Sequence, residues 1–121
     1  MVRALLDTCI LIDHLNGVAE ARDEIARYDA PLISVVTWME VLVGARPEVE
    51  PATRAFLAAF TQVPLDETIA EAAIRLRRDR RLRLPDAIIA ASAEVAGAIL
   101  VTRNTKDFDE REPGVRVPYR R

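Results

Sequence analysis

The chain alternates very short apolar runs with longer segments of helical spacing, and this alternation restricts the fold more than any other feature. The runs that we expect to form strands lie at residues 4–6, 31–34 and 98–101, with a strand or connector at 62–64 and a last strand at 115–117. The expected helices span residues 8–15, 18–28, 35–45, 51–60, 66–82 and 85–97. Such alternation predicts an α/β fold with a parallel sheet covered by helices on both faces. At 121 residues, one domain is expected.

Charge is unevenly distributed although the net charge is only −2. The segment RLRRDRRLR, residues 75–83, holds six arginines and one aspartate. This run is either a site for an anionic partner or a solvated helix face. The single cysteine, Cys9, excludes an internal disulfide and favours a cytoplasmic location. We expect neither a signal peptide nor a membrane span.

Three acids stand at positions where an ordinary structural role does not fully account for them. Asp7 directly follows the first strand, so it either lines the carboxyl edge of the sheet or caps the helix that starts at Thr8. Glu40 lies in the apolar segment SVVTWMEVLVGA without a basic residue three or four positions away. It therefore needs solvent, a distant arginine or a cation. Asp86 follows Pro85 at the head of an apolar helix that we expect to be buried.

A fourth group of polar residues follows the strand at 98–101. Thr102, Asn104 and Asp107 lie in TRNTKDF and face the edge that Asp7 occupies if the strands are parallel. Carboxylates that converge without enough cations repel one another and have raised pKa values unless a metal ion neutralises them. Ligands that are all oxygen suit Mg²⁺ or Mn²⁺, and such sites support phosphoryl chemistry. A Cys9–His14 nucleophile pair is less favoured than a buried cysteine.

Four segments, in order, resemble the acidic motifs of PIN-domain ribonucleases, and most closely those of VapC-type toxins of type II toxin–antitoxin pairs. They are LLDTCILID, SVVTWMEVLVGA, LPDAIIAASA and LVTRNTKDF, and the resemblance extends from Leu5 to Phe108. It implies a three-layer α/β/α sandwich with a short, mainly parallel sheet, a single PIN domain over residues 1–121 and Mg²⁺- or Mn²⁺-dependent endonuclease activity on RNA. It also implies a small antitoxin partner and a homodimer.

The resemblance assigns roles by motif. Asp7, Glu40 and Asp86 match the three core acids, which are the expected metal ligands and catalytic residues. Asn104 stands where many relatives carry a fourth acid, and nearby Asp107 is included among the catalytic candidates. This departure leaves open whether one or two metal ions bind. Thr8 and Thr102 are expected to support the site. Contacts to the RNA backbone are expected from Arg103, Lys106 and Arg81.

Other functions are compatible with parts of the pattern. The arginine run favours a nucleic-acid or protein binding module without catalysis, and the metal chemistry alone does not distinguish RNA from DNA as a substrate. A phospho-receiver domain needs a late lysine and an aspartate after a central strand. Lys106 is the only lysine, and the second strand ends in Ser34. The endoribonuclease is therefore the preferred interpretation.

Overall fold

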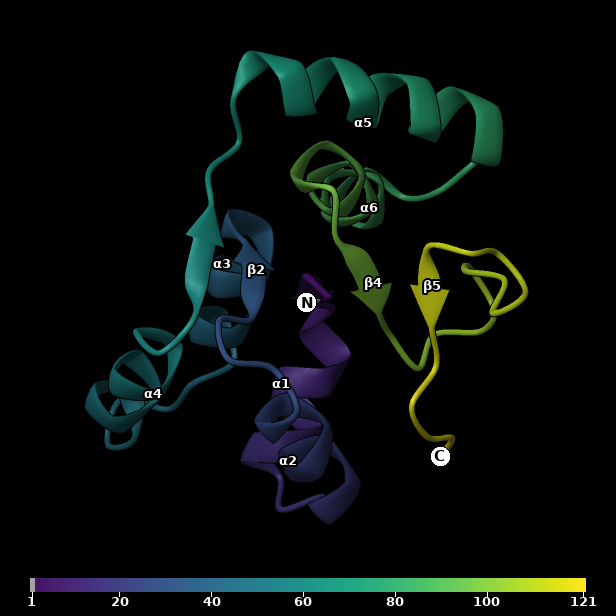
Figure 1. The fold of residues 1–121 in the computed structure, drawn as a ribbon. Coiled ribbons are helices and arrows are strands. Elements are labelled where there is room, and N and C mark those ends of the chain that lie inside the picture. The colour runs from purple at the N-terminus through teal and green to yellow at the C-terminus, as the bar shows by residue number, and fades with distance from the viewer. Residues whose placement is uncertain (1) are drawn as a thin grey trace.

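The computed structural model describes residues 2–121, and its centre is a five-stranded sheet (Figure 1). The strands are β1 (Ala4–Leu6), β2 (Leu32–Ser34), β3 (Thr61–Val63), β4 (Ile99–Val101) and β5 (Val115–Arg116). Their spatial order is β3-β2-β1-β4-β5, and every neighbouring pair is parallel. The prediction of an α/β fold with a short parallel sheet is confirmed.

Six helices connect and cover these strands within the described residues. They are α1 (Thr8–Leu15), α2 (Ala19–Ala26), α3 (Val35–Val43), α4 (Glu50–Leu57), α5 (Glu67–Arg80) and α6 (Leu84–Ala96). All were predicted, although several end earlier than expected. The helix predicted to reach Phe60 ends at Leu57 because the Phe60 amide bonds the Leu57 carbonyl in a tighter turn. The α5 helix ends before Leu82 because Arg81 is left-handed, with φ 57°.

Side chains that alternate along the strands divide the core into two layers. Leu5 and Leu100 point to the face covered by α5 and α6, whereas Leu6 and Val101 point to the face covered by α1, α2 and α4. In Figure 1 the α5 and α6 pair lies on the opposite side of the sheet from α1 and α2. The molecule is therefore the three-layer α/β/α sandwich that the sequence predicted.

The topology brings several chain segments to one edge of the sheet. Because the strands are parallel, the carboxyl ends of β1, β2 and β4 lie at the same edge, where Asp7, α3 and Thr102 follow them. The α6 helix is linked to β4 by only Gly97 and Ala98, so it runs back against the strand. Its first turn, which carries Asp86, consequently returns to the carboxyl edge. Along residues 2–121 we find no helix that is long and apolar enough to span a membrane.

A buried ion pair connects α2 to β5. Glu24 accepts hydrogen bonds from Nε and Nη2 of Arg116, at 2.7 and 2.9 Å, and from the Tyr28 hydroxyl at 2.6 Å. Burial raises the pKa of Glu24, but the bonds from Arg116 and Tyr28 outweigh it and bring the pKa below the ordinary value of 4.5. Its stabilising effect is therefore fully present above pH 4.5 and is lost as the pH falls through the lower folded-state pKa.

We expect Glu24→Gln to lower the free energy of unfolding at neutral pH by about 2–3 kcal/mol, because a buried Arg116 pairing is broken. Urea unfolding of both proteins measures this difference. The gap should narrow at a second, acidic pH below 4.5, as the native carboxylate loses its charge on approach to its lowered pKa. Glu20→Gln on the exposed face of the same helix is the control and should change little. An equal gap at both pH values would contradict the prediction.

Candidate active site

The three acids singled out from the sequence line one open cavity of about 450 Å³. Asp7 comes from the end of β1, Glu40 from the middle of α3 and Asp86 from the first turn of α6. The rest of the cavity lining comes from α1, from the residue before α6 and from the segment after β4: Thr8, Cys9, Ile12, Arg83, Arg103, Asn104, Thr105 and Lys106. Acids that are 79 residues apart in the chain, at positions 7 and 86, thus meet at one edge of the sheet.

Asp7 is the buried member of this group, with 6% of its surface exposed. One carboxylate oxygen accepts from the Thr8 amide at 2.8 Å, so Asp7 caps α1 and also lines the cavity. The other accepts from the Thr102 hydroxyl at 2.8 Å and the Cys9 thiol at 3.6 Å. Burial, and more weakly the nearby Asp86, raise the pKa of Asp7, against the lowering effect of its hydrogen bonds. All three donors are neutral, and within residues 2–121 the Asp7 carboxylate forms no ion pair with a cationic side chain.

Glu40 is exposed and is oriented by a threonine. Its Oε1 accepts from the Thr8 hydroxyl at 2.7 Å, and Thr8 Oγ1 lies 2.9 Å from the hydroxyl of Thr37. Since the single Thr8 hydroxyl proton serves Glu40, Thr37 must be the donor to Thr8. Thr37 is fully buried and was not among the predicted site residues. The sequence feature that could have identified Thr37 is its position three residues before Glu40 on the same apolar helix.

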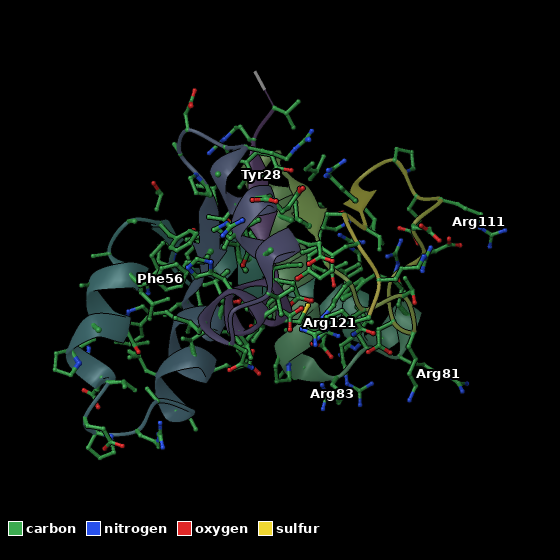
Figure 2. The ribbon with its side chains drawn as sticks, turned by 90° about the horizontal axis from the view of Figure 1, so that it is seen from below. Tyr28, Phe56, Arg81, Arg83, Arg111 and Arg121 are labelled. Atoms are coloured by element: carbon green, nitrogen blue, oxygen red, sulfur yellow. The ribbon has the colours of Figure 1, made fainter. Side chains whose placement is uncertain are left out.

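Asp86 has an intramolecular partner. Its Oδ2 lies 3.2 Å from Nε of Arg83, and the Asp86 side chain is 13% exposed whereas that of Arg83 is 82% exposed. Figure 2 shows Arg83 and Arg81 along one margin of the molecule, with their side chains extending outward. Exposed pairs of this kind are weak. The pair therefore holds Asp86 loosely.

The segment after β4 contributes unequally. Thr102 is buried and contacts Asp7 directly. Asn104 lines the cavity, and its backbone N–H donates to Thr102 Oγ1 at 2.9 Å. Asp107 is exposed, accepts from Nδ2 of Asn104 at 2.9 Å and lines a neighbouring cavity instead. The structure therefore does not bring Asp107, predicted to be catalytic, to the carboxylate cluster.

The predicted cationic contacts also differ in their surroundings. Lys106 is exposed and lines the cavity, and Arg81 is exposed at the end of α5. Arg103, expected to contact the RNA backbone, has its guanidinium paired with Asp13 through bonds of 2.5 and 3.0 Å. In the arginine run, Arg75, Arg80 and Arg83 pair with acids, whereas within residues 2–121 no ion pair forms at Arg77, Arg78 or Arg81.

The Cys9–His14 alternative finds no support. Burial raises the pKa of Cys9 to about 11, so the group is a thiol at neutral pH. Its sulfur contacts Asp7 and Thr102, while the His14 ring stacks on Phe56 with centroids 4.9 Å apart. Nucleophilic catalysis needs a thiolate beside a base. Here Cys9 is a thiol, and the His14 imidazole stacks on Phe56.

The oxygen-rich site fits a hard divalent cation in its chemistry. Asp7, Glu40 and Asp86 supply carboxylates, and among residues 2–121 no cationic side chain pairs with Asp7. Asn104 adds an amide oxygen, which accepts from the Asp107 backbone N–H at 3.3 Å. In the part of the chain that the structure describes, no three acidic, histidine or cysteine side chains are already close enough to hold a metal ion. Two of the carboxylates are instead engaged by Thr8 and Arg83.

Comparison with known proteins identifies the family. Residues 4–112 match the family model of the PIN domain. The chain belongs to the PIN domain family. It is 39% identical over 128 residues to "Ribonuclease VapC10" of Mycobacterium tuberculosis, covering 97% of this chain and 96% of that protein. The resemblance to VapC-type PIN domains is thereby confirmed.

Solved structures agree with this assignment. A chain of "Toxin-antitoxin complex from Klebsiella pneumoniae" is 44% identical, with a TM-score of 0.92 and coverage of 97% of this chain and 98% of that one. A chain of FitAcB from Neisseria gonorrhoeae, at 20% identity, has a TM-score of 0.80 over 95% of this chain and 97% of its own. The second likeness shows the PIN fold alone.

A divalent cation bound by Asp86 would compete with Arg83 for the same carboxylate, so Arg83→Ala should strengthen Mn²⁺ binding. From the strength of exposed ion pairs we expect a rise of about two- to fivefold in affinity, measured by titration calorimetry. Arg81→Ala is the matched control, because it removes the same charge from a residue without an ion pair in residues 2–121. Equal effects of both substitutions would show that general charge, and not the Asp86 contact, controls affinity.

Proposed function

We propose that this PIN-domain protein is the toxin of a type II toxin–antitoxin pair, and that it hydrolyses RNA phosphodiester bonds at Mg²⁺ or Mn²⁺ held by Asp7, Glu40 and Asp86. The observation that carries the proposal is the buried Asp7 carboxylate, without a cation of its own, in a cavity shared with two further acids. A relative with the name ribonuclease, 39% identical over nearly the whole chain, supports the choice of RNA.

The proposed roles follow from the hydrogen bonds in the site. The Thr8 amide and the Thr102 hydroxyl fix the Asp7 carboxylate in one orientation, which limits the rearrangement needed to bind a cation. Thr8 occupies Oε1 of Glu40, so Oε2 is the acceptor that can orient an attacking water. A divalent ion bound by these acids polarises the phosphate and lowers the pKa of a bound water. Asn104 is a supporting oxygen ligand.

The surface around the cavity suits a polyanion. Lys106 lies on the cavity lining, and Arg77, Arg78 and Arg81 extend the positive charge along the end of α5. Lysine and arginine bind phosphates without regard to base sequence. We therefore assign RNA-backbone contacts to Lys106 and Arg81.

The remaining parts of the proposal concern partners and location. A cognate antitoxin is proposed because similar chains come from structures described as toxin–antitoxin and VapBC complexes, among them one at 44% identity. A homodimer and a cytoplasmic location are proposed with it.

The direct test compares Asp86→Asn with the wild type on total RNA, with Mg²⁺ present or after chelation. Removing one carboxylate charge from the metal site should lower cleavage at least about 100-fold, while circular dichroism shows an unchanged fold. Asp23→Asn, an exposed acid on α2, is the control and should cleave normally. Metal-dependent cleavage by Asp86→Asn at the wild-type rate would refute the assignment.

The same assay separates the other functions. RNA that is bound but never cut, with binding unaffected by chelator, would indicate a binding module without catalysis. Cleavage of single-stranded DNA in preference to RNA would indicate a DNA nuclease of the same fold. Each outcome would replace the ribonuclease proposal.

A further inference from the structure

Asp13 is a buried acid that lies outside the carboxylate cluster but contacts its wall. It stands near the end of α1 and is 3% exposed. Arg103 donates to both of its carboxylate oxygens, at 2.5 and 3.0 Å, and the Tyr119 hydroxyl donates at 2.8 Å. Arg121 lies 3.9 Å away, and Figure 2 shows it near the ribbon of α1.

These bonds fasten the segment after β4 at two points along α1. Thr102 donates to Asp7 at the start of the helix, and Arg103 donates to Asp13 near its end. Asn104 follows directly, and its amide donates to Thr102 Oγ1. Thr102 and Arg103 are thus each bonded to an acid of α1 or its N-cap, and Asn104, which lines the cavity, is bonded to Thr102.

Asp13 also determines where the Arg103 charge lies. Arg103 is part of the cavity lining, but its guanidinium is bound to Asp13. Burial raises the pKa of Asp13, and the bonds from Arg103 and Tyr119 outweigh it, so that the pKa lies below its ordinary value and the group is ionised at neutral pH. Without that anion, the guanidinium is free to turn toward the nearest acids in the cavity, where it competes with a divalent cation.

We propose that Asp13 is a positioning residue for the active site, which fixes residues 102–104 against Asp7 and keeps the Arg103 charge away from the metal ligands. The consequence for catalysis rests on the proposed function, whereas the consequence for the geometry of residues 102–104 does not. Residues that orient metal ligands without touching the metal commonly change affinity by tenfold or more.

The chain supplies a matched control in Glu24. This acid is 4% exposed, accepts two bonds from Arg116 and one from the Tyr28 hydroxyl, and so repeats the chemistry of the Asp13 group. It lies on α2, and none of its partners lines the carboxylate cavity. A loss of general stability should affect both groups alike, whereas a positioning role belongs to Asp13 alone.

The experiment compares Asp13→Asn with Glu24→Gln in the full chain, using hydrogen exchange of the backbone amides and Mn²⁺ titration calorimetry. For Asp13→Asn we expect exchange at Thr102 and Asn104 to rise at least about tenfold and Mn²⁺ affinity to fall about tenfold. Glu24→Gln should change Mn²⁺ affinity by less than about twofold. Its lower global stability should raise exchange at Asn104 no more than at core amides such as that of Leu6. The double variant Asp13→Asn with Arg103→Gln should recover the Mn²⁺ affinity that the freed Arg103 charge removes. Hydrogen exchange at Thr102 and Asn104 should stay as fast as in Asp13→Asn.

Two milder substitutions test the same role if Asp13→Asn or Glu24→Gln fails to fold. Tyr119→Phe removes one bond to Asp13, and Tyr28→Phe removes the equivalent bond to Glu24. Only Tyr119→Phe should raise exchange at residues 102–104. Equal responses within either pair, or unchanged exchange in Asp13→Asn, would overturn the positioning role. A wild-type protein that cuts no RNA, with the exchange result as expected, would refute the proposed function and leave the positioning role standing.

Discussion

The candidate site depends on the parallel pairing of β1 with β4. The pairing places Leu6 beside Val101 and continues one residue further, where the Asp7 amide bonds the Val101 carbonyl at 2.9 Å. This register brings the Thr102 hydroxyl to the Asp7 carboxylate and buries both groups. A shift of one residue would turn these side chains to the other face. The first acid of the site is therefore fixed by backbone hydrogen bonds of the sheet, whereas Glu40 and Asp86 are carried by helices that pack on it.

Burial makes Asp7 chemically different from the other two acids. Three neutral donors surround it, and such donors lower the energy of a carboxylate without cancelling its charge. Glu40 is exposed, and Asp86 already has an arginine beside it. A cation bound here would gain most from Asp7 and would have to displace Arg83 to gain from Asp86. Its affinity would depend on two carboxylates with neutral partners, Asp7 and Glu40, and on one that Arg83 partly compensates.

The features that follow from local chemistry were predictable from the sequence. Apolar runs and capping residues such as Ser34 indicated the elements. The position of Asp86 in the first turn of a helix apolar on nearly every side indicated that this acid lies near the sheet. The Arg103 pairing was not predictable, because its partner Asp13 is 90 residues away and occupies an ordinary polar position of a helix. The position of Asp107 outside the carboxylate cavity was not predictable for a related reason. Sequence spacing gives the distance along a loop but not its direction. The Asp107 carboxylate accepts a hydrogen bond from the side-chain amide of Asn104 and so points toward that residue.

The arrangement of arginines gives the site its electrostatic character. Arg83 and Arg103 both line the cavity, yet each is paired with an acid of this chain, one with Asp86 and the other with Asp13. The two pairs differ in burial, because the Arg103 side chain is 33% exposed and that of Arg83 is 82% exposed. The Asp13 carboxylate also accepts a hydrogen bond from Tyr119. The Arg83 pair is therefore the easier of the two to open, and a cation or phosphate bound at the site would break it before the Arg103 pair. On this basis Arg83 would respond to ligands, whereas Arg103 would keep the shape of the site.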